Sequence, residues 1–347
     1  MLTVLRYPTT SPITSACRAA TGRSLLLHFA RRWNPQVVYM PCYVPEGVIK
    51  PFKESGATIV FYKLDEQLRP DTDILALDLA MAVHGGARPV IVVIHYCGMV
   101  QPMGALREIA DRYGAVLLSD CAHALLNSAA HTQFADVVLY SLSKFLPVAD
   151  GAVIATTKLD LDLSVAEEAL PEMHQEASAA FTAHLEFNRT IGLAQHGADI
   201  SSVLESSAEA YEAYYKHIDG DMELKTQSAR SRAIEARTNL ATMRKVRERN
   251  SRILSDMMPP SLLVREDQDC QFAFPIRCCG KREEMIAALC EIGVLASSLS
   301  DKWEFIPLSG FEVEANFIDD HLLLPIGEQV SQESIITMVD ALARVEL

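Results

Sequence analysis

The sequence predicts an α/β protein, with a mostly parallel sheet that carries helices on both faces. Three observations support this fold class. Short β-type segments alternate with helical segments through the first half of the chain. The β-type segments carry apolar residues at successive positions, which indicates strands that are covered on both faces. Repeated strand–helix units are the pattern that a sheet between two helical layers requires.

The predicted strands of the first half are short and almost continuously apolar. They are residues 36–40, 58–63, 89–96, 115–120, 136–140 and 151–155. The helices predicted between them are residues 45–56, 71–83 and 103–114. Gly56 and Gly114 end the first and the last of these helices, and Asp71 or Thr72 caps the second.

The second half of the chain predicts helices and a smaller α+β unit. Residues 159–219 carry few β signals and are expected to be mostly helical. Residues 225–252 hold nine Lys/Arg against two Glu, which favours a long helix with a solvated basic face over a nucleic-acid site. The smaller unit contains residues 270–277, 281–293 and 331–345. We therefore expect a large domain over residues 1–225, and a helical connection with a small C-terminal domain over residues 226–347.

Composition narrows the classes of partner. The chain has 347 residues and a formal net charge of −14, which disfavours nucleic acid and anionic membranes as partners. No segment has the apolar length that spans a bilayer, and the N-terminal segment lacks the apolar core of a signal peptide, so we expect a cytoplasmic protein. None of the eight cysteines has CxxC spacing, which predicts buried thiols and no metal site.

Three polar residues follow neighbouring strands of the predicted sheet. Asp120 ends one strand, His123 comes three residues later, and Lys144 lies just beyond the next strand. Taken singly, they are typical of a turn cap, a packed histidine and a solvated lysine. Because ligands of such sheets bind at the carboxyl ends of the strands, the three together predict a carboxylate, an imidazole and an amine in one site.

This combination suits pyridoxal 5'-phosphate (PLP). The cofactor needs a lysine amine to bind its aldehyde, and a carboxylate that keeps its pyridine nitrogen protonated. Its phosphate needs N–H groups at the start of a helix, together with hydroxyl groups. The segment Thr21–Ser24 precedes a predicted helix, and Ser141 ends the strand before Lys144.

The motifs "LLSDCAHAL" (117–125) and "LYSLSKFLPVADGAVI" (139–154) resemble those of the DegT/DnrJ family of sugar aminotransferases, which has the aspartate-aminotransferase-like fold. The segments "MPCYVPEGVIKPFKESGATIVFYKLD" and "IHYCGMVQPM" are similar to further parts of that family, as are two segments of the C-terminal domain. The resemblance covers most of the chain.

The resemblance implies roles for the three polar residues. Lys144 would be the Schiff-base lysine, and Asp120 would pair with the pyridine nitrogen. His123 stands where the family has Gln or His beside the ring hydroxyl. The sequence departs from the family at Ser143, where a basic residue is common, and at Ala152, where glycine is usual.

The resemblance also implies cofactor contacts outside these three residues. Ser141, Gly22 and Arg23 would hold the phosphate. Tyr43 or His95 would lie over one face of the cofactor ring. The family further implies a homodimer in which the active sites lie at the subunit interface.

The reaction that the resemblance implies is transfer of an amino group from an amino acid, such as glutamate, to a keto or aldehyde sugar that is often nucleotide-linked. Two alternatives stay open: another PLP reaction on an amino-acid substrate, and a degenerate family member that serves as a scaffold or regulator. No arginine of the C-terminal domain falls in a carboxylate-clamp motif, which favours a pocket of neutral donors and aromatic residues. Trp303 and Tyr43 are candidates for its mouth.

Overall fold

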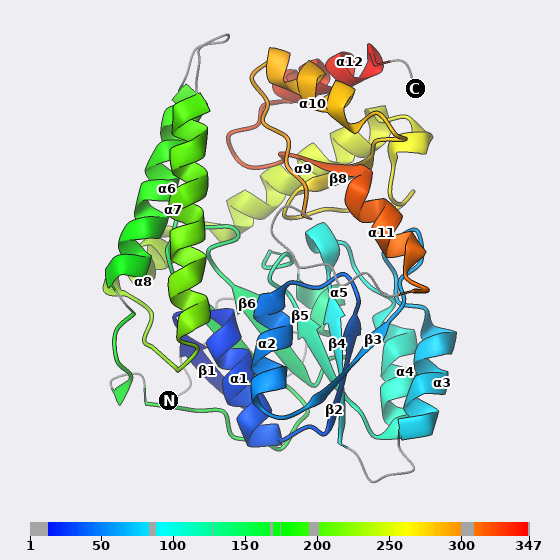
Figure 1. The fold of residues 1–347 in the computed structure, drawn as a ribbon, viewed down its shortest axis with the longest axis vertical. Helices are drawn as coiled ribbons and strands as arrows, with labels where there is room; N and C mark the ends of the chain where they lie inside the picture. Colours follow the sequence, from blue (N-terminus) through cyan, green and yellow to red (C-terminus); the bar gives the residue numbers. More distant parts are fainter. Residues whose placement is uncertain are drawn as a thin grey trace.

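A seven-stranded sheet forms the centre of the computed structural model, which describes residues 13–82, 88–126, 128–166, 169–173, 175–193, 201–299 and 309–345. The strand order is β1-β7-β6-β5-β4-β2-β3 (Figure 1). Its strands are β1 (Ser15–Ala19), β2 (Val37–Pro41), β3 (Thr58–Tyr62), β4 (Pro89–Ile94), β5 (Val116–Asp120), β6 (Val137–Ser141) and β7 (Ala152–Thr156). Strands β2 to β6 pair in parallel, whereas β7 is antiparallel to β1 and β6. The predicted fold class is confirmed, although the sequence analysis missed β1.

Helices cover both faces of this sheet. Helices α1 (Gly22–Trp33) and α2 (Glu46–Glu54) connect β1 to β2 and β2 to β3, so the chain advances across the sheet towards β3. Helices α3 (Thr72–Ala82), α4 (Met103–Tyr113) and α5 (Ser128–Thr132) connect β3 to β4, β4 to β5 and β5 to β6, so the chain returns in the opposite direction. Because crossovers between parallel strands are right-handed, opposite directions of travel place the two groups on opposite faces.

The second half begins with two long helices that pack side by side, α6 (Gln175–Leu193) and α7 (Ser201–Gly220) (Figure 1). The expectation of a mostly helical segment is therefore confirmed for its described part. The prediction of a single long basic helix was wrong, because the chain forms two helices there, α8 (Ala229–Arg237) and α9 (Leu240–Met257). Thr238 leaves the helical conformation, and the Asn239 side chain then accepts the Thr242 N–H at 3.1 Å and starts α9.

The last elements of the chain form the smaller α+β unit. Strands β8 (Phe274–Arg277) and β9 (His321–Leu324) pair antiparallel. The helical elements of this unit are η4 (Pro260–Leu262), α10 (Arg282–Glu291), α11 (Glu312–Asp319) and α12 (Gln332–Ala343). The short helix η2 (Tyr96–Gly98) instead follows β4 of the large sheet. The division into domains at residue 226 stays a prediction. Six of the eight cysteines are buried and all eight are free thiols.

Among the helices of the described ranges, none combines the length and the apolar character that crossing a bilayer requires.

Gly98 lies where the two units meet, and its backbone has a φ of +90°. A Cβ atom there would lie 2.7 Å from the Gln271 Cβ of the smaller unit and 2.7 Å from the His123 carbonyl oxygen. These contacts leave room only for glycine, which adopts a positive φ without strain. The close approach of the chain at Gly98 therefore fixes how the smaller unit meets the sheet.

We expect Gly98→Ala to lower the free energy of unfolding by about 3 kcal/mol, because backbone strain and overpacking add. Gly56→Ala is the matched control: its φ is +87°, and nothing lies within 4 Å of the added Cβ. In the control, the free energy of unfolding should fall by only about 1 kcal/mol, which is the cost of a positive φ for a residue with a Cβ. Chemical denaturation of both variants measures the difference, and equal losses would contradict the close packing at Gly98.

Candidate functional site

Asp120, His123 and Lys144 meet at the carboxyl edge of the sheet. Asp120 is the last residue of β5, and His123 lies in the turn that follows it. Lys144 lies in the connection from β6 to β7 and is half-buried. Its positive charge influences the pKa of both Asp120 and His123, so the three groups share one electrostatic environment. The sequence prediction that these three groups converge agrees with this placement.

The Asp120 carboxyl is 6% exposed. Its Oδ1 accepts the backbone N–H of Ala122 at 2.9 Å. Burial raises the pKa of Asp120 to about 6, while the Ala122 N–H and the charge of Lys144 act in the opposite direction. A carboxylate in this position gains from a cationic partner, because burial of an uncompensated charge is unfavourable.

The His123 imidazole is also 6% exposed, and burial lowers its pKa to about 3, with the charge of Lys144 as a second cause. The ring is therefore neutral at physiological pH. It stacks on the ring of Phe272 from the smaller unit, with the centroids 4.2 Å apart and an angle of 7° between the planes. A neutral imidazole carries one N–H donor and one acceptor nitrogen, which suits a hydrogen bond to a ring hydroxyl.

Gly22 and Ser141 lie close to each other beside this site. The side chain of Thr21 accepts the Ser24 N–H and starts α1 at Gly22. A Cβ at Gly22 would lie 3.6 Å from the Leu139 Cδ2 atom, so the start of α1 rests on β6. Ser141 is two residues beyond Leu139 and thus on the same face of the strand. The first N–H groups of the helix and a hydroxyl accordingly border the same space, as phosphate binding requires.

The Arg23 guanidinium is directed towards α7. It forms an ion pair with Asp219 and lies 5.2 Å from the ring centroid of Tyr215. Burial lowers the pKa of Arg23, and the neighbouring tyrosines and Glu46 oppose this change. Its backbone N–H still belongs to the first turn of α1, so the main chain of Arg23 is its candidate contact for a phosphate.

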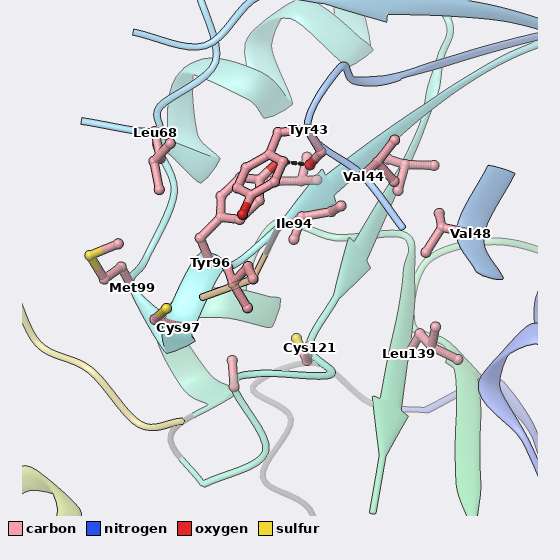
Figure 2. Close-up of a cluster of buried hydrophobic side chains, with 14 of the residues drawn as sticks. Tyr43, Val44, Val48, Leu68, Ile94, Tyr96, Cys97, Met99, Cys121 and Leu139 are labelled. Atoms are coloured by element: carbon pink, nitrogen blue, oxygen red, sulfur yellow. Dashed lines mark hydrogen bonds between the residues drawn. The ribbon is translucent and has the colours of Figure 1, made fainter. Parts of the chain in front are cut away.

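Tyr43 lies inside an aromatic cluster that joins the two units. It is 1% exposed and stacks on Tyr96, with centroids 5.6 Å apart and planes 9° from parallel (Figure 2). Tyr96 donates its hydroxyl to the Tyr43 carbonyl oxygen. Phe317 and His321 of the smaller unit pack on the Tyr43 ring, 6.1 and 6.4 Å away. Its role over a cofactor ring or at the pocket mouth stays a prediction, and Trp303 lies outside the described residues.

His95 lies on the face of the sheet opposite to Asp120. Its Nε2 is 2.8 Å from the Ser119 hydroxyl, and Ser119 and Asp120 point to opposite faces because they are neighbours in β5. The imidazole is fully buried and packs edge-on against His131, with centroids 4.5 Å apart. This placement does not favour the alternative in which His95 covers the cofactor ring.

The donor set fits PLP. Lys144 offers an amine, Asp120 a buried carboxylate that lacks a cationic side chain bonded to it in the described structure, and His123 a neutral imidazole. The start of α1 and Ser141 offer donors for a phosphate. Within the described ranges, no group of three or more His, Cys, Asp or Glu side chains is arranged to hold a metal ion.

Three residues that support the site carry no signal in the sequence. Asp150, six residues after Lys144, accepts the Ser228 N–H at 2.7 Å and the Ser228 hydroxyl at 3.0 Å. Tyr214 of α7 donates its hydroxyl to the Ala149 carbonyl oxygen at 2.8 Å. Both contacts hold the connection from β6 to β7, which carries Lys144. The third residue is Phe272, which stacks on the His123 ring. All of them join segments that are distant in sequence, so no local pattern marks them.

The sheet and the site define a fold that solved aminotransferases share. The sugar aminotransferase CalS13 from Micromonospora echinospora has a TM-score of 0.64 at 16% identity, over 94% of this chain and 86% of CalS13. Spr1654 from Streptococcus pneumoniae in its PLP form has a TM-score of 0.61 at 14% identity, over 98% of this chain and 92% of Spr1654. These likenesses establish the PLP-dependent transferase fold.

Residues 36–162 match the model of the DegT/DnrJ/EryC1/StrS aminotransferase family, which confirms the resemblance read from the sequence. A curated relative, the L-glutamine:2-deoxy-scyllo-inosose aminotransferase of Streptomyces kanamyceticus, is 41% identical over 69 residues. The aligned part is 20% of this chain and spans only 15% of that relative's length. Family and fold together support an aminotransferase that depends on PLP.

We expect Asp120→Asn to stabilise the cofactor-free protein at about pH 8 and to leave it unchanged at about pH 3.5. The unfolded chain releases the Asp120 proton near pH 3.8 and the folded protein near pH 6, so ionisation destabilises the fold as pH rises through this window. The full cost above pH 6 is about 3 kcal/mol, which the neutral amide avoids. Urea denaturation at both pH values measures it.

The control for this prediction is Asp160→Asn, which changes an exposed loop residue and should alter stability little at either pH. An Asp120→Asn protein that is less stable than the parent protein at about pH 8 would contradict the destabilising carboxylate.

Proposed function

We propose that this protein is a PLP-dependent aminotransferase that moves an amino group from an amino acid to a keto or aldehyde sugar, including nucleotide-linked sugars. The observation that carries the proposal is the convergence of Lys144, Asp120 and His123 at the carboxyl edge of a sheet with this fold. The family match over residues 36–162 supports the class of reaction.

When bound, PLP supplies an electron sink that stabilises negative charge at the carbon from which a proton is removed. Lys144 would hold the cofactor through its amine, and its Nζ would serve as the general base and acid that carries the proton. Asp120 would keep the pyridine nitrogen protonated, because a buried carboxylate favours a cation beside it. His123 would hydrogen-bond the ring hydroxyl, and Gly22, Arg23 and Ser141 would hold the phosphate.

The amino donor is an amino acid, with glutamate as our first expectation. The curated relative is named for L-glutamine and a keto inositol, which supports an amide or acid of this size as donor and a polyhydroxylated ketone as acceptor. Both glutamate and glutamine therefore belong in the first assays.

The arginines of the smaller unit support a sugar acceptor over an amino-acid substrate. Arg265 donates to the carbonyl oxygens of Gln67 and Val100, both at 2.7 Å. Arg277 donates to the Glu66 carbonyl oxygen, and Arg282 to the Ser298 hydroxyl at 3.2 Å. Side chains engaged in this way hold the fold together, whereas a carboxylate clamp needs a guanidinium that faces the substrate.

A homodimer remains part of the proposal, and its support is the family resemblance. The cytoplasmic location stays a prediction.

We expect the protein with added PLP to absorb visible light, and borohydride to remove that band and fix a pyridoxyl group on Lys144. Lys144→Ala should show no such band, because the amine is lost. Lys158→Ala, which changes an exposed lysine, is the matched control and should keep the band. Peptide mapping by mass spectrometry locates the label, and a label on another lysine would refute the assignment.

We further expect glutamate or glutamine to convert the bound cofactor to its amine form, and a keto sugar to restore the visible band faster than simple 2-oxo acids do. The reason is that the guanidinium groups of Arg265, Arg277 and Arg282 are engaged with acceptors of the protein itself. Stopped-flow absorbance of each half-reaction measures the rates. If 2-oxo acids restore the band and no keto sugar does, the acceptor is an amino-acid-derived keto acid instead.

A further inference from the structure

Gln271 and Phe272 of the smaller unit form a wedge, a two-residue segment inserted against the carboxyl edge of the large sheet. Their backbone N–H groups both donate to the Cys97 carbonyl oxygen, at 2.9 and 3.0 Å. The Gln271 side-chain oxygen accepts the Leu126 N–H at 2.9 Å, in the turn that also holds His123. The wedge is thus bonded to the segments that follow β4 and β5.

Arg247 of α9 hydrogen-bonds the backbone of the wedge. Its Nη1 donates to the carbonyl oxygens of Gln271 and Phe272, at 2.9 and 3.0 Å. Its guanidinium also lies 5.2 Å from the ring centroid of Phe145, the residue next to Lys144. Phe145 in turn packs edge-on against Phe272, with centroids 6.1 Å apart. Four side chains therefore pack in one continuous row, in the order Arg247, Phe145, Phe272 and His123.

Stacking on Phe272 restricts rotation of the His123 ring about its χ2 bond. The two rings are 7° from parallel and 4.2 Å apart, so rotation of the imidazole would collide with Phe272. Stacking covers a face of the imidazole, whereas the two nitrogens form their hydrogen bonds in the ring plane, which the phenyl ring does not block.

We infer that Phe272 is a positioning residue, which holds the His123 imidazole in one orientation and so makes PLP binding through His123 depend on the placement of the smaller unit. This inference rests on the proposed function. Phe272 touches His123 and acts through it, and no proton or bond passes through the phenyl ring.

A double-mutant cycle on PLP binding tests the inference. The dissociation constant of PLP is measured by spectrophotometric titration for the parent protein, Phe272→Leu, His123→Ala and the double variant. We expect Phe272→Leu to weaken binding about tenfold, which matches the upper range of an aromatic pair. In the His123→Ala background the same change should have almost no effect, because the residue it positions is gone.

Two further variants separate positioning from loss of structure. Phe272→Tyr keeps the stacked ring and should retain the affinity of the parent protein. Phe61→Leu removes a half-buried phenyl ring from β3, far from the site in sequence and strand order, and should leave PLP affinity unchanged. If Phe272→Leu does not fold, as circular dichroism would show, Phe272→Met replaces it with a similar volume and no ring.

The outcomes distinguish this inference from the proposed function. A parent protein that gives no visible band with PLP would overturn both. A normal band with equal affinity in Phe272→Leu, or an equal loss with and without His123, would overturn the positioning role and leave the proposed function standing.

Discussion

The buried carboxylate of Asp120 is the constraint on which the site depends. It lies at the end of a strand whose neighbours on both sides are parallel, so the sheet itself removes it from water. Burial raises its pKa to about 6, which means that the fold bears an unfavourable charge at neutral pH unless a cation lies beside it. A protonated pyridine nitrogen is such a cation. The proposed chemistry needs this carboxylate, and its burial makes the folded protein less stable. Such a loss of stability is common at functional sites.

The rest of the architecture holds three chain segments around that carboxylate. The start of α1 rests on β6 at Leu139, which brings the helix N-terminus beside Ser141. The Lys144 connection is fixed by Asp150 and by Tyr214 of α7, so the long α6–α7 pair serves the site although it lies outside the sheet. The wedge of the smaller unit closes the third side at His123. Each support comes from a different part of the sequence.

Much of this could be predicted from local patterns. Continuous apolar runs gave the parallel strands, because a strand covered on both faces has no polar side. Gly114, with a φ of +63°, marked the end of α4, and Thr21 marked the start of α1. Strand β1 was missed because "SACRA" has few β-type residues, and it is a strand only through its pairing with β7. The break between α8 and α9 was missed because basic side chains continue across Asn239 without a change of pattern.

The sequence by itself determined the residue types and their order: a carboxylate and an imidazole at the end of one strand, an amine after the next strand, and a glycine turn before a helix. It determined their convergence too, since parallel strands end at one edge. Only the tertiary structure decided which side chains face that edge. His95 follows β4 as Tyr43 follows β2, yet Ser119 holds His95 on the far face and the aromatic cluster buries Tyr43. Arg23 turns to Asp219, and Phe272 reaches His123. These contacts join residues far apart in the chain, and their geometry depends on packing that no local pattern encodes.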